Sequence, residues 1–510
     1  MSPSVQLFAF NTTIAKELQE RVNRLALPAN HPDHLKPLAA PSLYQQAIFR
    51  EIATGRGSLI VKAVAGSGKT TTCVQSLRYI PGVDLTRVRA STFHSAGFKA
   101  VAKKLDLPFA SIKTDGGKVG QLARETLGEV EQNLYGSFCA QLVGLAKGQG
   151  IGVLSPDSAD AWFNLIQHHD LYLEDEQADE ERAVQIARDL LKKSNEVAKQ
   201  GRLDFDDMLY LPLLWRLRLW QNDYVYVDEA QDTNPVRRAL AKLALRPGGR
   251  LIAVGDERQA IYGFTGASHD AMDLIRQEFN CKELPLTVSY RCPKAVGRKA
   301  QELVEYFEVA PTAIEGSVDT LTLPEALKVL GPHDAILCRQ TRPLISLAFT
   351  LIAAGTGCAI LGRDIAKGLV DLIKKRKASG IDALTSKLEA FRDREVARFL
   401  AKGEEGKAES ITDRVGCVLT VIEHLAEDER TVPKLVLKLE SMFTDTNGVL
   451  LLSTVHKAKG REWDNVAILE PELMPSKWAR QDWQYQQELN LMYVAWTRAI
   501  KSLIFIKEGA

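Results

Sequence analysis

The sequence has few of the features that mark secreted, membrane or metal-cluster proteins. Its 510 residues include only seven cysteines, and none of them forms a Cys-x-x-Cys pair, which argues against a zinc or iron–sulfur site. An odd number of scattered cysteines is typical of reduced, buried thiols. The chain also lacks an apolar run of about 18 residues and an N-terminal signal with basic and apolar parts. We therefore expect a cytoplasmic (nucleoid-associated) or nuclear protein that is neither secreted nor inserted in a membrane.

The chain also lacks an excess of charge of either sign. Its 65 lysines and arginines balance 64 aspartates and glutamates, so the formal net charge is +1. A strongly basic total would favour nucleic acid as a partner. The near-neutral total leaves that question open, because acidic faces elsewhere can offset a basic channel. A chain of 510 residues is too long for one ordinary core, so we expect three or four structural units.

Short apolar runs alternate with helical stretches near both ends of the chain. This alternation predicts doubly wound parallel sheets. The expected buried strands are Ser58–Val64, Tyr224–Val227, Leu251–Val254, Ala335–Cys338, Val449–Ser453 and Val466–Leu469. Two long helical regions, at about 105–203 and 371–446, interrupt the pattern, and their charge clusters favour solvated helix faces. A proline-rich stretch, Leu27–Pro41, is predicted to be a linker.

A phosphate-binding loop is predicted where one buried strand leads into a helix. Leu59–Thr72 has the sequence LIVKAVAGSGKTTT, although Ala63 stands where the usual motif has its first glycine. The glycines let backbone N–H groups approach phosphate oxygens, and the positive end of the helix points at them. In this pattern Lys69 reaches the β- and γ-phosphates, while the Thr70 hydroxyl binds Mg²⁺. The candidate phosphate-binding residues are Ala65, Gly66, Ser67, Gly68, Lys69, Thr70 and Thr71.

Paired carboxylates follow a second predicted strand. Tyr224–Asp232 has the sequence YVYVDEAQD, which places Asp228 and Glu229 at the carboxyl end of the strand, where open α/β sheets bind ligands. We expect Asp228 to hold Mg²⁺ together with Thr70, and Glu229 to orient or deprotonate the attacking water. An Asp-Glu pair alone is more often a loop or a helix cap. Downstream of a phosphate loop, the pair indicates a nucleoside triphosphatase.

Further segments resemble, in their order along the chain, the UvrD/Rep/PcrA class of superfamily 1 helicases. They are PSLYQQAIF around Gln45, Ser91–Phe98 (STFHSAGF), Asp204–Leu211 (DFDDMLYL), Val254–Ala267 (VGDERQAIYGFTGA), Leu286–Pro293 (LTVSYRCP), Ser453–Trp463 (STVHKAKGREW) and Leu489–Ala499 (LNLMYVAWTRA). Each segment alone has an ordinary structural explanation. Their joint order over most of the chain makes a chance match negligible.

The resemblance implies a role for individual residues of these segments. Gln45 would read adenine, Tyr290 would stack on it, and Glu462 would bind the ribose. Gln259 would sense the γ-phosphate, Arg291 would reach it, and Arg498 would act as an arginine finger. The residues implied to contact DNA are Phe10, Asn11, Phe93, His94, Tyr262, Phe264, Thr454 and His456.

The same resemblance implies a fold of two RecA-like P-loop lobes with parallel sheets, each carrying a mainly helical insertion. The first lobe would comprise 1–104 and 204–284 around an insertion at 105–203. The second would comprise 285–370 and 446–510 around a smaller insertion at 371–445.

The implied activity is 3′–5′ movement of a monomer on single-stranded DNA or DNA junctions, driven by ATP and Mg²⁺. A translocase that strips proteins from DNA without unwinding it fits equally well. A non-catalytic DNA-binding scaffold is disfavoured by the intact catalytic residues, and a P-loop kinase by the two last motifs. RNA as the track stays a minor alternative, because stacking contacts do not exclude the 2′-hydroxyl.

Three features depart from the class. Thr265 stands where an arginine is usual, and the second insertion is much shorter than in well-known members. The third departure is Val5–Val22, VQLFAFNTTIAKELQERV, which resembles a motif that normally follows the phosphate-loop helix but here precedes the loop. We expect its strand to fill the usual place in the first sheet with changed connectivity, which the linker is long enough to allow. Phe10 and Asn11 would then still face DNA.

Overall fold

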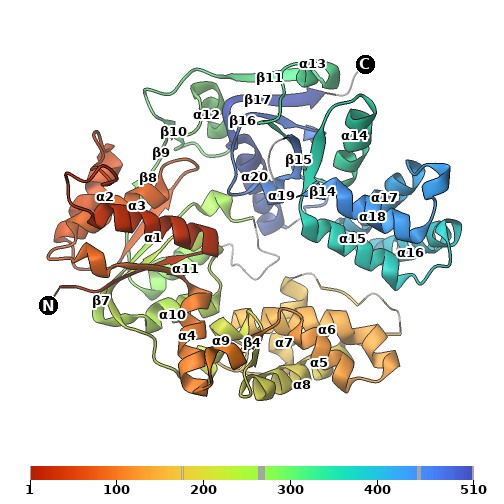
Figure 1. Cartoon of the computed structure of the whole chain (residues 1–510), viewed down its shortest axis with the longest axis horizontal. Helices are drawn as coiled ribbons and strands as arrows, with labels where there is room; N and C mark the ends of the chain where they lie inside the picture. Colours follow the sequence, from red (N-terminus) through yellow and green to blue (C-terminus); the bar gives the residue numbers. More distant parts are fainter. Residues whose placement is uncertain are drawn as a thin grey trace. The chain divides into compact units, whose positions relative to one another are not determined.

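The structure is a computed structural model that describes residues 2–169, 171–173, 175, 177–261, 270–401, 403–444, 449–479 and 481–507. The chain divides into two compact units, Met1–Thr287 and Val288–Ala510. Each unit contains one large parallel sheet, packed helices and a helical insertion (Figure 1). The expected α/β fold with two parallel sheets, consistent with two RecA-like lobes, is therefore confirmed.

The first unit is built on a six-stranded sheet with the order β3-β1-β6-β7-β2-β8. Every neighbouring pair in it is parallel. The strands are β1 Val5–Ala9, β2 Leu59–Ala63, β3 Arg89–Thr92, β6 Asn222–Val227, β7 Leu245–Gly255 and β8 Lys282–Leu286. All three strands that the apolar runs predicted for this unit are present, as β2, β6 and β7.

Side-chain alternation along the strands divides the core of this unit into two layers. Val5, Leu7 and Ala9 of β1 pack with helices on one face of the sheet, whereas Phe8 packs with a second cluster on the other face. The period of two that directs neighbouring side chains to opposite faces explains this division. The helices of the first layer are α1 Thr12–Ala26, α2 Leu43–Thr54 and α3 Lys69–Ser76, and those on the other side are α4 Phe93–Leu105, α9 Asp207–Leu214, α10 Pro235–Leu243 and α11 Ala271–Glu278.

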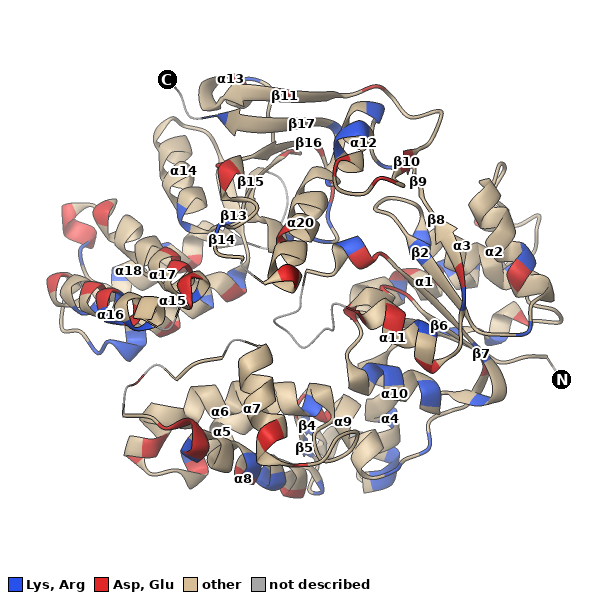
Figure 2. Ribbon diagram, turned by 180° about the vertical axis from the view of Figure 1, so that it is seen from behind, with Lys and Arg blue, Asp and Glu red and all other residues tan. Residues whose placement is uncertain are grey.

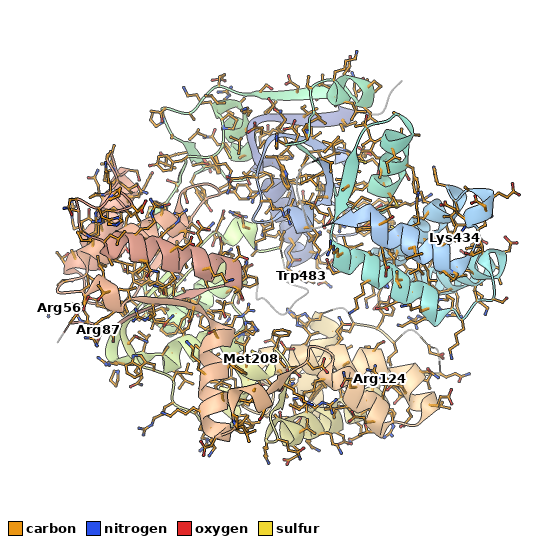
Figure 3. All side chains as sticks on the ribbon, in the orientation of Figure 1. Arg56, Arg87, Arg124, Met208, Lys434 and Trp483 are labelled. Carbon is orange, nitrogen blue, oxygen red and sulfur yellow. The ribbon has the colours of Figure 1, made fainter. Side chains whose placement is uncertain are left out.

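Helices α4 and α9 approach each other closely at a glycine. A Cβ atom added to Gly97 of α4 would lie 1.8 Å from the backbone oxygen of Met208 on α9, whose side chain is labelled in Figure 3. Only a residue without a side chain fits at such a distance. The glycine in the STFHSAGF segment is therefore required by helix packing.

The first insertion is a helical cluster with its own apolar core. It contains α5 Lys118–Thr126, α6 Glu129–Gln149, α7 Ala159–His168 and α8 Glu180–Ala198, with the short strands β4 Lys113–Thr114 and β5 Arg202–Leu203 pairing in parallel. Trp162, which is 0% exposed, lies in this core.

Four charged side chains are buried beside that core. Lys147 Nζ lies 2.6 Å from Asp204 Oδ2 and 2.7 Å from Asp207 Oδ1. Lys118 also pairs with Asp207 and donates to the backbone oxygen of Ser194. Burial opposes ionisation, but the two lysines hold the pKa of Asp204 below its usual value. The two aspartates belong to the DFDDMLYL segment, so this segment joins the insertion to α9.

The second unit is built on a seven-stranded parallel sheet with the order β11-β17-β16-β12-β15-β13-β14. These strands are β11 Ser317–Thr322, β12 Ala335–Cys338, β13 Cys358–Leu361, β14 Phe443–Thr444, β15 Leu450–Thr454, β16 Trp463–Ile468 and β17 Ala499–Lys507. The pair β9 Val288–Ser289 and β10 Glu308–Val309 is separate. The apolar runs predicted β12, β15 and β16, which lie side by side in the middle of the sheet.

The helices of the second unit include a compact insertion. The helices that alternate with sheet strands along the chain are α12 Lys294–Gln301, α13 Leu323–Leu327, α14 Arg342–Ala353, α19 Val455–Ala458 and α20 Asp482–Trp496. The insertion contains α15 Arg363–Lys375, α16 Ile381–Ala401, α17 Glu405–Glu423 and α18 Val432–Met442. Figure 2 shows acidic and basic residues mixed along α15–α18, as predicted for solvated helix faces.

The N-terminal strand enters the first sheet, as the unusual position of its motif predicted. Val5 pairs with Tyr224 of β6 and Gln6 pairs with Arg89 of β3, both in parallel. The stretch predicted to be a linker contains no helix or strand between α1 and α2, but it packs on the unit. Leu35 N donates to Arg24 O, so the segment runs back along α1.

All seven cysteines are free thiols. Across the described ranges, no helix combines the length and apolar character needed to cross a membrane.

Candidate functional site

The phosphate loop connects the buried strand β2 to helix α3. Gly66 and Gly68 have φ values of 71° and 76°, in the left-handed region that favours glycine. Helix α3 begins at Lys69, directly after Gly68. The Ser67 side chain is 1% exposed, and its Oγ has no hydrogen-bond partner within the described part of the chain. A buried hydroxyl without a partner beside a helix N-terminus fits the phosphate group of a nucleotide.

Carboxylates from the end of β6 face the start of α3. The Thr70 hydroxyl donates to Asp228 Oδ2 at 3.0 Å, and Lys69 Nζ lies 3.6 Å from Glu229 Oε2. Burial and the neighbouring Glu229 raise the pKa of Asp228 to about 6, although Lys69 opposes this shift. A hydroxyl and a carboxylate at this separation are ligands of the kind that Mg²⁺ prefers. The residues that the sequence assigned to phosphate, metal and water therefore lie together.

A chain of hydrogen bonds extends from Glu229 to Gln259. Gln231 Nε2 donates to Glu229 Oε2 at 2.7 Å, and Gln231 Oε1 accepts from the backbone N–H of Asp256 at 2.9 Å. Gln259 Nε2 then donates to Asp256 Oδ2 at 2.6 Å. A Cβ atom on Gly255 would lie 2.6 Å from Gln231 Oε1, so a larger residue there would displace the Gln231 amide. The sequence analysis singled out Glu229 and Gln259, the two ends of this series of hydrogen bonds. It missed Gln231 and Asp256, although both stand inside the quoted motifs.

Two other expected nucleotide residues are Gln45, which donates a hydrogen bond to α3, and Thr71, which is part of α3. The side chain of Gln45 is 4% exposed, and its Nε2 donates to Thr72 Oγ1 at 3.1 Å. Gln45 also completes the capping box of α2 with Ser42. Thr71 Oγ1 accepts from Arg21 Nη1 at 3.0 Å. Arg21, on the helix that follows β1, links the displaced N-terminal segment to the phosphate loop.

The expected DNA-contacting residues of the N-terminal motif lie where β1 ends. The Arg237 guanidinium lies 4.7 Å from the centre of the Phe10 ring, a cation–π geometry. Asn11 is exposed and caps α1 by accepting from the backbone N–H of Ile14 at 2.9 Å. The sequence analysis did not predict a role for Arg237, because this residue stands outside every quoted motif.

The two residues expected from the STFHSAGF segment differ in exposure. Phe93 is 4% exposed and stacks on Phe8, with 4.2 Å between the ring centres. The expectation that Phe93 faces DNA does not fit this placement, because its ring fills the core. His94 is half-buried, and burial together with Arg237 lowers its pKa to about 4, so its ring is neutral at pH 7. Tyr262, Phe264 and the unusual Thr265 lie outside the described residues.

Two of the four residues expected to bind the nucleotide in the second unit, Arg291 and Glu462, lie together. Arg291 Nε lies 2.5 Å from Glu462 Oε2, and Arg291 Nη1 donates to Thr497 O at 3.4 Å. Tyr290 is 50% exposed, so its ring is accessible for stacking. The carboxylate expected to bind ribose is thus paired with the arginine expected to reach phosphate.

Arg498, the expected arginine finger, is buried within its own unit. Its side chain is 1% exposed. Its Nε donates to Val494 O at 2.9 Å and its Nη1 donates to Arg461 O at 3.2 Å. In this arrangement the guanidinium is held by backbone carbonyls of α20 and of the segment before β16. Direct contact with a phosphate would require a rearrangement of these bonds.

The last two residues expected to contact DNA lie at the junction of β15 and α19. Thr454 is 7% exposed and stands at the N-cap position of α19. His456 is half-buried, and burial together with Arg339 and Lys457 lowers its pKa to about 3. Lys457 Nζ lies 2.6 Å from Asp364 Oδ2 of α15. The motif therefore joins the sheet to the insertion of this unit.

Two family profiles match the chain. The UvrD/REP helicase N-terminal domain matches residues 81–280, and the UvrD-like helicase C-terminal domain matches residues 432–509. The first match begins after the phosphate loop, so the displaced N-terminal motif lies outside it.

Curated relatives extend over different shares of the chain. F-box DNA helicase 1 of Gallus gallus is 24% identical over 513 aligned residues, which cover 88% of this chain and 47% of the relative. ATP-dependent DNA helicase Rep of Escherichia coli strain K12 is 37% identical over 111 residues, covering 20% and 16%. A probable DNA helicase II homolog of Mycoplasma pneumoniae is 24% identical over 416 residues, covering 60% and 58%. The chain thus spans less than two thirds of each of these relatives. Taken with the motif order and the two parallel sheets, these matches show that the chain belongs to the UvrD/Rep-like family of superfamily 1 helicases.

Proposed function

We propose that this protein is an ATP-dependent DNA helicase or translocase that moves 3′ to 5′ on single-stranded DNA. The observation that carries the proposal is the group formed by Lys69, Thr70, Asp228 and Glu229 in the first unit. It has the cation, hydroxyl and carboxylates that phosphoryl transfer from ATP requires. The direction of movement and the track rest on the family resemblance.

Each residue of this group in the first unit would have its own role in ATP hydrolysis. Backbone N–H groups of the loop and Lys69 would bind the phosphates. Thr70 and Asp228 would hold Mg²⁺, which supplies charge neutralisation on the phosphate oxygens when bound. Glu229 would orient the attacking water and accept its proton. We propose that Arg291 and Arg498 of the second unit complete the charge compensation, with Tyr290 on adenine and Glu462 on ribose.

The DNA track is proposed to pass the carboxyl end of β1. Phe10 offers an aromatic face beside the Arg237 guanidinium, and aromatic and cationic groups together bind single strands without sequence preference. Figure 2 shows basic residues along both α4 and α10. They are Lys99, Lys103, Lys104, Arg237, Arg238 and Lys242. We propose that the protein acts on single strands and junctions as a monomer, in the cytoplasm or nucleus.

ATP hydrolysis with and without single-stranded DNA tests this proposal. We expect DNA to stimulate hydrolysis, and single-stranded RNA, run in parallel, to stimulate it less. An ATP hydrolysis rate that neither DNA nor RNA changes would overturn the motor assignment. A complete lack of hydrolysis would favour the DNA-binding scaffold. If DNA stimulates, separate assays of duplex unwinding and of protein displacement distinguish the helicase from the stripping translocase.

Replacing Glu229 with glutamine is expected to slow ATP turnover about 10²-fold or more, the loss typical of a missing general base. The amide keeps the size of the side chain but cannot accept a proton, so ATP should still bind. Steady-state hydrolysis and binding of a fluorescent ATP analogue measure the two effects separately. Glu283→Gln, which alters a glutamate on the edge strand β8 that pairs with Lys62, is the matched control and should behave like the unaltered protein. Unchanged turnover in the Glu229 variant would refute its role.

A further inference from the structure

The first unit has a groove at the amino-terminal end of β6, the end opposite Asp228. Its volume is about 880 Å³. The lining residues come from the loop after α6, the end of α9, the segment before β6, and the junction of α10 with β7. They are Val153, Leu154, Pro212, Leu213, Arg216, Leu217, Arg218, Leu219, Trp220, Gln221, Leu243 and Arg246. None of the residues assigned to ATP or DNA is among them.

Large apolar side chains in this groove are exposed to solvent. Trp220 is 80% exposed and Leu154 is 46% exposed. An exposed apolar side chain is common when it stands alone, but a group of them around a concavity is typical of an interaction site. Tryptophan in particular is enriched among residues that anchor protein interfaces.

The charges of the groove have one sign. Its lining includes Arg216, Arg218 and Arg246 but no aspartate or glutamate. Arg246 is paired with Asp223 at 3.0 Å, whereas Arg216 and Arg218 are exposed and make no ion pair within the described ranges. Arg216 also has a φ of 51°, a left-handed conformation that costs about 1–2 kcal/mol for a residue with a side chain.

We propose that this groove docks a short acidic segment of a partner protein, with one large apolar side chain packed beside Trp220. The partner's carboxylates would pair with Arg216 and Arg218, since charge-assisted bonds to arginine are strong and directional. Charge complementarity excludes a basic segment. The apolar lining favours a peptide over nucleic acid, because a phosphate backbone needs several cations and has no side chain to fill an apolar groove. The inference goes beyond the proposed function, and it depends on neither ATP nor DNA.

Binding of a defined peptide set to the full chain tests the inference. The probes are fluorescein-labelled 12-residue peptides in which aspartates and glutamates flank one tryptophan, phenylalanine or leucine. The reference probes carry lysine at each acidic position. Fluorescence polarisation measures binding, and an unlabelled single-stranded oligonucleotide serves as a competitor.

Three variants locate the binding. We expect Arg216→Glu combined with Arg218→Glu, and separately Trp220→Ala, to weaken binding of the acidic peptides by about tenfold or more, a change of about 1.4 kcal/mol. The control combines Arg56→Glu with Arg87→Glu, two exposed arginines of the same unit that are labelled in Figure 3 and lie outside the groove. It changes the net charge equally and should alter binding less than twofold, and ATP hydrolysis should be retained in all of these variants.

Several results would overturn the inference. One is that no acidic peptide binds more tightly than its lysine counterpart. Another is that the control variant loses as much affinity as the groove variants, which would show a general effect of charge. Displacement of the peptides by the oligonucleotide, with the same dependence on Arg216 and Arg218, would assign the groove to nucleic acid instead.

Discussion

Replacing Lys69 with alanine is expected to lower ATP hydrolysis by about 10²–10³-fold, the loss typical of removing one preorganised group that stabilises developing charge. The Lys69 ammonium lies 3.6 Å from Glu229 Oε2, and it opposes the raised pKa of Asp228. Without it, Asp228 and Glu229 would face each other with less compensating charge. Protonation of Asp228 would become easier, which would weaken its binding of Mg²⁺. The substitution therefore removes a phosphate contact and disturbs the metal site together.

Steady-state phosphate release with saturating single-stranded DNA measures this effect. Lys62→Gln is the matched control, because Lys62 lies on β2, the strand that leads into the same loop, and pairs with Glu257, Asp273 and Glu283. Partly exposed pairs of this kind contribute little, so the control should hydrolyse ATP normally. Near-normal hydrolysis in the Lys69 variant would overturn the assignment of the phosphate loop.

Replacing Asp207 with alanine is expected to lower the free energy of unfolding of the first unit by about 3–5 kcal/mol, the cost of removing one partner from a buried charge network. Asp207 is 0% exposed, and its carboxylate binds both Lys118 and Lys147. In the variant, two buried ammonium groups would share Asp204 alone. The cost arises from the unpaired buried charge, so a second substitution, Lys118→Met, should recover part of the loss.

Urea unfolding followed by circular dichroism and tryptophan fluorescence measures this prediction. Asp189→Ala is the control, since Asp189 lies on α8 in an exposed pair with Lys192 and surface changes of this kind usually stay within about 0.5 kcal/mol. A loss below about 1 kcal/mol for Asp207→Ala, or a further loss on adding Lys118→Met, would contradict the network account.

Sequence patterns predicted the centres of both sheets better than their edges. The apolar runs gave β2, β6 and β7 in the first unit because these strands are covered on both faces. They missed β8, with the sequence KELPL, because an edge strand keeps exposed charged residues. The strand order across each sheet has no local signal either, since it depends on pairing between distant segments.

The motifs predicted only part of the candidate site, because Gln231 and Asp256 were missed although both lie within quoted motifs. The motif pattern placed Thr70 and Asp228 together, and the structure puts their side chains 3.0 Å apart. It gave no indication of Arg237, which stands outside the quoted motifs, and it did not single out Arg21, which stands inside Val5–Val22. It also assigned Phe93 to DNA, because a motif identifies a segment but not the direction of each side chain along it. The roles of the individual residues in ATP and DNA binding stay predictions.

The position of β1 in the chain also determines how long this strand exists before its neighbours in the sheet are synthesised. Val5 pairs with Tyr224 and Gln6 pairs with Arg89, so the strand is synthesised well before either neighbour. At about 5–20 residues per second, β6 leaves the ribosome roughly 10–40 s after β1. During that interval a short apolar segment has no partner on one side, and closing so long a loop slows folding. The displaced motif therefore lengthens the loop that must close before β1 can pair, relative to a chain in which the same strand follows α3.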